Sequence, residues 1–136
     1  MIDKSTLTKI QSCKALQGKS VEDIIGSDRF VANLSAYVTE QREARKAAVA
    51  SFNAMRKAGA KGYKLPAHPI DKTLKLSVED FAVEFAAVVT GASERPASER
   101  KYIEQLGQQA YNLTIAQIVC EEFPELEPAL MPKADN

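Results

Sequence analysis

The longest regular pattern of apolar and polar positions runs from Ser27 to Ala60. At about 100° per residue, an α-helix over this segment gathers its apolar side chains in one narrow stripe and its cations in a neighbouring stripe. The apolar stripe contains Phe30, Leu34, Tyr37, Ala44, Ala48, Phe52 and Met55. The basic stripe contains Arg42, Arg45, Lys46, Arg56 and Lys57. The pattern therefore predicts one long helix, over residues 28–58, with a packing face beside a basic face.

Helix start and stop signals divide the rest of the chain into further helices. Ser20 and Ser77 are each followed three positions later by an aspartate, which is typical of helix N-terminal caps. Apolar residues at helical spacing predict a helix over 3–16, a short one after Ser20, one from 78 to Gly91, and a last one from Ser98 to Glu122. The sequence thus predicts an all-α, single-domain bundle of about four to five helices, over residues 1–123.

Two segments carry no helical signal. Residues 59–76 contain two glycines and two prolines and predict a long connecting loop, although the alternation over residues 72–76 leaves a β-hairpin as the alternative. Residues 124–136 follow the Phe123-Pro124 stop and have prolines at four-residue spacing. We expect this last segment to be a flexible tail outside the helical domain.

Composition is that of an ordinary globular domain, with 45% apolar and 26% charged residues. Cys13 and Cys120 lie far apart and without the spacing of metal ligands, so we expect free, buried thiols rather than a disulfide framework or a zinc site. The N-terminus has no hydrophobic run typical of a signal peptide, and no apolar run is long enough for a membrane span. We expect a cytoplasmic protein with no membrane partner.

No motif indicates catalysis. His68 is the only histidine, and it lies in the proline-containing loop with no partner at a recognisable spacing. The glycines and lysines of residues 59–64 lack the spacing of a phosphate-binding loop. We therefore predict no catalytic residue, cofactor, metal site or small-molecule substrate, and we interpret the protein as non-enzymatic.

The net charge is zero, but its distribution is uneven. Residues 41–64 carry a net charge of +6, whereas residues 77–136 carry a net charge of −7. These two segments can attract each other within one molecule or between copies, or each can attract an outside partner.

The first functional hypothesis is self-association, with a dimer favoured, through the long helix. About 30 residues of helix span roughly 45 Å, which exceeds the width of about 30–35 Å expected for a domain of this size. Small side chains on the helix allow a second helix to approach closely. The residues expected at this interface are Ala44, Ala48, Phe52 and Met55.

The alternative hypothesis is nucleic-acid binding through the basic face and the loop 59–64. Lysine and arginine side chains on one helix face are suited to contact successive phosphates. The candidate residues are Arg42, Arg45, Lys46, Arg56, Lys57, Lys61 and Lys64. The competing interpretation is a solvated face whose charges pair with the acidic C-terminal half.

Overall fold

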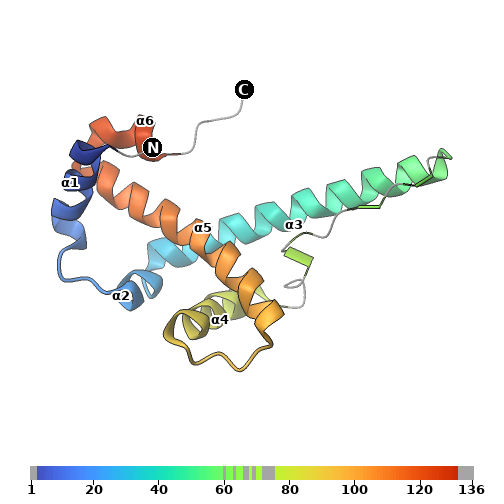
Figure 1. Cartoon of the computed structure of the whole chain (residues 1–136), viewed down its shortest axis with the longest axis horizontal. Helices are drawn as coiled ribbons and strands as arrows, with labels where there is room; N and C mark the ends of the chain where they lie inside the picture. The colour runs from blue at the N-terminus through green and yellow to red at the C-terminus, as the bar shows by residue number, and fades with distance from the viewer. Residues whose placement is uncertain are drawn as a thin grey trace. The chain divides into compact units, whose positions relative to one another are not determined.

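A computed structural model describes residues 3–59, 61–62, 64–65, 68, 70–71 and 76–131. These residues form α-helices and 3₁₀ turns without any strand, which confirms the predicted all-α class (Figure 1). The helices are α1 (Lys4–Ser12), α2 (Val21–Ile25), α3 (Asp28–Lys57), α4 (Val78–Thr90), α5 (Ala97–Glu122) and α6 (Glu127–Leu130), with 3₁₀ turns η1 (Lys14–Leu16) and η3 (Pro124–Leu126). The predicted long helix is α3. The hairpin alternative falls largely on residues 72–75, which lie outside the described residues.

Serine hydroxyls cap three of these helices, and two of the serines, Ser20 and Ser77, are the caps that the sequence analysis names. In each case the hydroxyl accepts the N–H of the residue three positions later, one of the donors that a helix start leaves without an internal partner. The pairs are Ser20 with Asp23, Ser27 with Phe30 and Ser77 with Asp80, at 3.1, 3.2 and 3.1 Å. Gly91 ends α4 with a φ of 80°, a backbone conformation that favours glycine.

Two predicted helix boundaries are wrong. α1 ends at Ser12 rather than at residue 16, because the backbone of Cys13 leaves the helix with a ψ of 118°. The N–H of Lys14 then donates to both carboxylate oxygens of Glu122, at 3.0 and 3.2 Å, instead of to a carbonyl of α1. The start of α5 is Ala97, so Ser98 is its second residue and not its cap.

The chain divides into two compact units. The first is built from two segments of the sequence and the second from one. Unit 1 comprises Met1–Asn33 and Gln109–Asn136, and unit 2 comprises Leu34–Gln108. The domain boundary predicted after residue 123 is not a boundary of either unit, since residues on both sides of it belong to unit 1.

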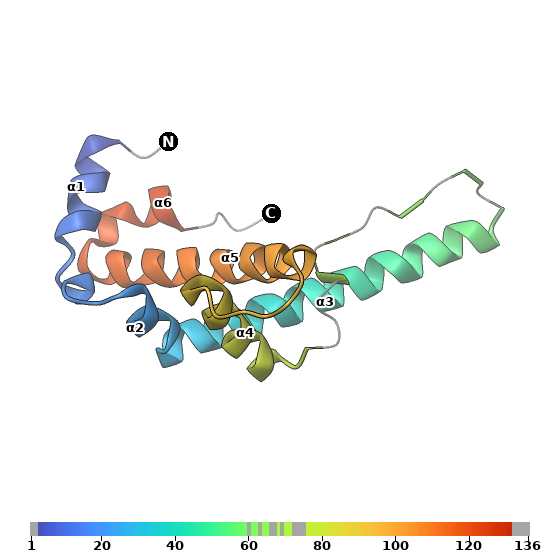
Figure 2. The same cartoon turned by 60° about the horizontal axis from the view of Figure 1, so that its bottom comes forward.

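The core of unit 1 contains part of the segment predicted to be a flexible tail. Leu126 in η3 is only 6% exposed and packs in one cluster with Cys13 and Val119, both fully buried. In both views α1 and α6 lie at the C-terminal end of α5 (Figures 1 and 2). Residues 124–131 therefore form helical turns packed on the core, whereas the sequence predicts a flexible tail from residue 124; residues 132–136 lie outside the described residues.

The prolines that suggested flexibility are compatible with these turns. Pro124 lies at the start of η3 and Pro128 at the start of α6. A helix start needs no N–H donor, and the fixed φ of proline suits that position. Leu126 and Leu130 then fall four residues apart, and both contact the core cluster.

Polar contacts hold the C-terminal half of α5 within unit 1. Glu121 and Glu122 lie where the helix dipole disfavours negative charge. Arg29 forms an ion pair with Glu121, while Glu122 accepts the N–H of Lys14. Both acidic residues thus have partners from the N-terminal part of the unit, which offsets the unfavourable position.

Unit 2 packs α4 and α5 tightly through Gly107. A Cβ atom on Gly107 would lie 2.1 Å from the ring of Phe85, which is 1% exposed. The glycine therefore allows a closer approach of the Phe85 ring to α5 than any other residue permits. The fully buried side chains of this unit include Leu34, Val38, Ile70 and Phe81.

Candidate interaction surface on α3

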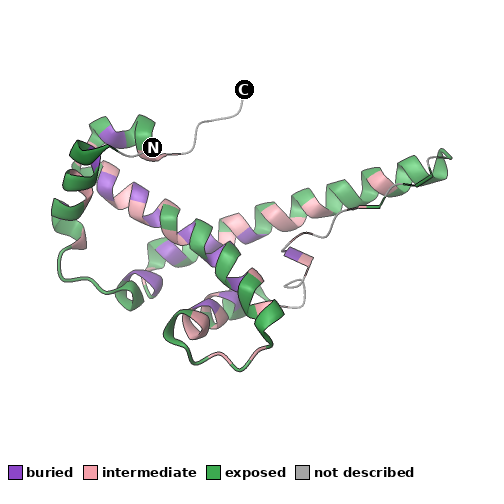
Figure 3. Ribbon diagram, in the orientation of Figure 1, coloured by how far each residue is buried: buried purple, intermediate pink, exposed green. Residues whose placement is uncertain are grey.

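The second half of α3 packs against little of the described chain. From Glu43 to Lys57 only Arg45 and Phe52 are partly buried, and all other residues are exposed. Figure 3 shows this half of the helix almost entirely in the colour of exposed residues. Most of the circumference of this half is therefore available for contact with a partner.

Arg45 is not available to bind a partner, because it forms a bidentate ion pair with Asp71. Its Nε and Nη2 atoms donate to the two carboxylate oxygens of Asp71 at 2.8 and 2.7 Å. The side chains are only 15% and 31% exposed, respectively. Bidentate arginine–carboxylate pairs of this kind contain some of the stronger charge-assisted hydrogen bonds in proteins.

Asp71 and His68 form a small hydrogen-bonded turn around this ion pair. Asp71 also accepts the N–H of His68 at 3.2 Å, and the Nδ1 atom of His68 accepts the N–H of Ile70 at 3.1 Å. Burial by itself raises the pKa of Asp71, but the hydrogen bonds from Arg45 and His68 outweigh it and hold that pKa below its usual value. The single histidine of the chain thus has a structural role in a turn.

Arg42 also contacts the segment that returns from α3. Its guanidinium donates to the carbonyl oxygen of Leu76. Arg42 and Arg45 thus connect Leu76 and Asp71 of the returning segment to α3. Ile70, next to Asp71, is fully buried. Two of the seven cations predicted to bind nucleic acid therefore take part in the internal structure of unit 2.

The other five predicted cations are Lys46, Arg56, Lys57, Lys61 and Lys64, and all five are exposed. None of them forms an ion pair with a described residue. The sequence contains no acidic residue between Glu43 and Asp71, so no neighbour in that segment offsets their charge. Along the described part of the chain, no ion pair neutralises these five cations.

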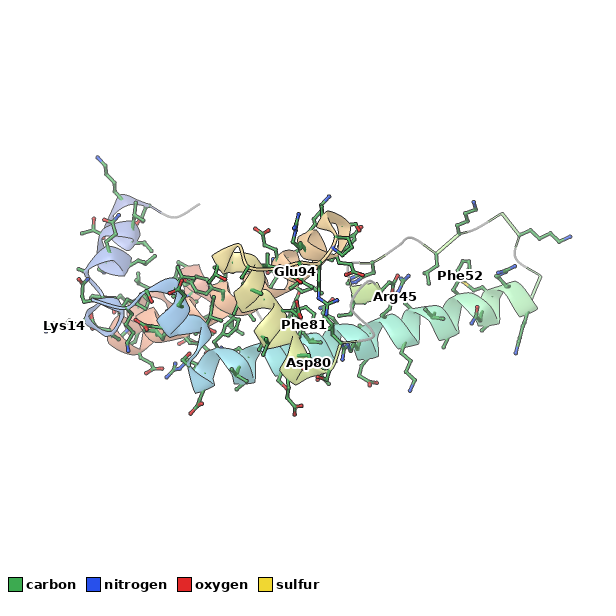
Figure 4. All side chains as sticks on the ribbon, turned by 90° about the horizontal axis from the view of Figure 1, so that it is seen from below. Lys14, Arg45, Phe52, Asp80, Phe81 and Glu94 are labelled. Carbon is green, nitrogen blue, oxygen red and sulfur yellow. The ribbon has the colours of Figure 1, made fainter. Side chains whose placement is uncertain are left out.

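The predicted self-association residues do not all have the same exposure. Ala44, Ala48 and Met55 are exposed, and Met55 is 49% exposed. Phe52 is partly buried and lies on the same side of α3 as Arg45 (Figure 4). Phe52 therefore belongs to the side that faces the returning segment.

The exposed apolar surface includes four residues that the narrow stripe omitted: Ala47, Ser51, Ala54 and Ala58. Ala44, Ala47, Ser51, Ala54 and Ala58 follow one another at alternating spacings of three and four residues, which aligns them along one face at about 100° per residue. We call this surface the uncharged face; it comprises Ala44, Ala47, Ala48, Ser51, Ala54, Met55 and Ala58, all exposed. The alternating spacing of three and four residues is the sequence signal from which the uncharged face could have been predicted.

The described residues contain neither a metal-binding cluster nor a disulfide. No group of three or more histidine, cysteine, aspartate or glutamate side chains there is placed to hold a metal ion. Cys13 and Cys120 are free thiols, and burial, with a smaller contribution from the charge of Glu127, raises the pKa of Cys120. None of the described helices combines the length and apolarity needed to cross a membrane.

Comparisons with known proteins add no family to this description. No protein-family model matches the chain, and neither the curated proteins nor the solved structures yield a match.

Proposed function

We propose that this protein is a non-enzymatic, self-associating assembly protein of the cytoplasm, whose copies pair through the uncharged face of α3. The observation that carries this proposal is the exposure of seven uncharged residues on one face over residues 44–58, including Met55. The two free cysteines agree with a reducing compartment.

A second helix is the partner that best fits this face. Helices gain most of their stability from packing an apolar face, and this half of α3 has no described element on that face. Alanine side chains allow two helix axes to approach to about 8 Å, at the short end of helix packing distances. About 15 residues of helix form a small interface, so we expect a weak dimer that depends on protein concentration.

Replacing Ala54 with glutamate is expected to abolish this dimer. The carboxylate would lie in the middle of the uncharged face, where pairing would remove it from water without a partner. Sedimentation equilibrium over a range of protein concentrations measures the effect. Asn53→Glu introduces the same charge on a neighbouring exposed position outside the face and serves as the matched control.

The proposal is wrong if the natural sequence stays monomeric at all concentrations. It is also wrong if the Ala54→Glu variant dimerises as well as the Asn53→Glu control. Circular dichroism of both variants establishes that the helices remain folded.

Nucleic-acid binding is the second candidate function, favoured by the five exposed cations that have no ion pair among the described residues. Lysine and arginine side chains bind phosphates by releasing condensed counterions, a contribution that depends on salt. This proposal no longer includes Arg42 and Arg45, because both have internal partners.

The double variant Lys57→Gln with Lys61→Gln tests this candidate. We expect weaker binding to a single-stranded oligonucleotide and a salt dependence reduced by about 1 to 2 in log–log slope, measured by fluorescence anisotropy. Arg100→Gln with Lys101→Gln removes two exposed charges from α5 and is expected to change neither quantity. Equal losses in the two variants, or no binding by the natural sequence, would contradict this second function.

A further inference from the structure

The uncharged face is bordered by opposite charges at its two ends. Glu43 precedes Ala44 by one residue and Lys57 precedes Ala58 by one residue, so both lie on the same edge of the face. They are two heptads apart, which is roughly 21 Å along the helix. Both side chains are exposed, and neither forms an ion pair with a described residue.

From this arrangement we infer that two copies of the chain pair with their α3 helices antiparallel; the inference rests on the proposed function. With the helices in opposite directions, Ala44 of one copy lies opposite Ala54 of the other, and Ala47 lies opposite Ser51. In this register Glu43 of each copy lies beside Lys57 of the other. The pair thus gains two symmetrical contacts between opposite charges at the edges of the interface.

A parallel pair lacks these contacts. Its two Glu43 residues lie at one end and its two Lys57 residues at the other, and Glu43 faces the methyl group of Ala48. Charged residues beside the packed positions of paired helices commonly determine their orientation. The dipoles of two antiparallel helices also attract each other, whereas parallel dipoles repel. Both electrostatic contributions therefore favour the antiparallel arrangement.

Small residues make the antiparallel register sterically possible as well. The residues brought opposite one another at the centre of this register are Ala47, Ala48 and Ser51, none larger than serine. Close approach of the backbones is therefore unobstructed, and the edge charges come within reach of each other. Met55 lies opposite Gln41, where a flexible side chain can fill the remaining space.

Charge reversal tests the orientation. At low ionic strength, Glu43→Lys or Lys57→Glu alone is expected to weaken the dimer about fivefold to tenfold, because two attractive pairs become two repulsive ones. Combining Glu43→Lys with Lys57→Glu restores opposite charges and is expected to restore the affinity. Arg100→Glu reverses an exposed charge on α5, away from α3, and is expected to leave the dimer unchanged.

Cysteine cross-linking provides a second measurement that does not depend on charge. With copper phenanthroline added as the oxidant, an Ala44→Cys chain mixed with an Ala54→Cys chain forms a mixed disulfide in an antiparallel dimer, and neither variant cross-links efficiently to itself. In a parallel dimer each variant cross-links to itself. Mass spectrometry of the linked peptides distinguishes these products from any that involve the partly buried Cys120.

The outcomes separate the orientation from the proposed function. Restored affinity in the double charge reversal together with mixed cross-links supports the antiparallel dimer. A dimer that is insensitive to both reversals, or that yields self-linked chains, overturns the orientation and leaves self-association standing. A natural sequence that remains monomeric at every concentration overturns both.

Discussion

Replacing Gly107 with alanine is expected to destabilise the protein by about 2–3 kcal/mol. In an ordinary helix interior the same substitution stabilises by about 1 kcal/mol, because alanine has the higher helix propensity. Here the added Cβ would lie 2.1–2.5 Å from three ring atoms of Phe85, so α4 or the ring must move. Urea denaturation monitored by circular dichroism measures the free energy of unfolding.

Two further variants test whether contact with the Phe85 ring causes the loss of stability in Gly107→Ala. Phe85→Leu removes the ring edge, so the cost of Gly107→Ala is expected to fall in the Phe85→Leu background, a coupling that a double-mutant cycle detects. Gln105→Ala places alanine at an exposed position of the same helix and is expected to change stability by no more than about 0.5 kcal/mol. A stabilising Gly107→Ala would contradict the close packing of Phe85 on α5.

Leu126→Ala is the second substitution with a large expected effect, a loss of about 2–3 kcal/mol in the free energy of unfolding. Leu126 is 6% exposed and packs with Cys13 and Val119, so truncation leaves a cavity in the core of unit 1. Hydrogen exchange is expected to show faster exchange in α1 and in the last turns of α5, the elements that contribute Ile10 and Val119 to the cluster.

The matched control for this substitution is Ala129→Ser, at an exposed position of α6. It is expected to have little effect, since it removes no buried apolar area. If Leu126→Ala were as mild as this control, residues 124–131 would not contribute to the core, and the original expectation of a flexible tail would apply.

The internal contacts of Arg42 and Arg45 change how the basic face is interpreted. Both arginines lie on the predicted basic stripe. Substitution of either would remove a contact with the returning segment as well as a charge from any binding surface. A loss of nucleic-acid binding in an Arg45 variant is therefore ambiguous. Lys57 and Lys61 are the informative positions, because both are exposed and neither forms an ion pair with a described residue.

The all-α class, the extent of α3 and the serine caps could be predicted from the sequence because they depend on local interactions. A serine three residues before an aspartate, and apolar residues at helical spacing, act within one or two turns of the chain. The observed helix Asp28–Lys57 and the caps at Ser20 and Ser77 agree with those predictions.

Partners distant in the sequence decided the remaining features, and no local pattern encodes them. The Arg45–Asp71 pair spans 26 residues, and the contact of the Lys14 N–H with Glu122 spans 108 residues. The first removes a cation from the predicted binding surface, and the second accompanies the early end of α1. Periodicity alone shows which residues share a helix face; only the tertiary structure shows which faces are already packed, and hence why the uncharged face of α3 is open while Phe52 and Arg45 are not.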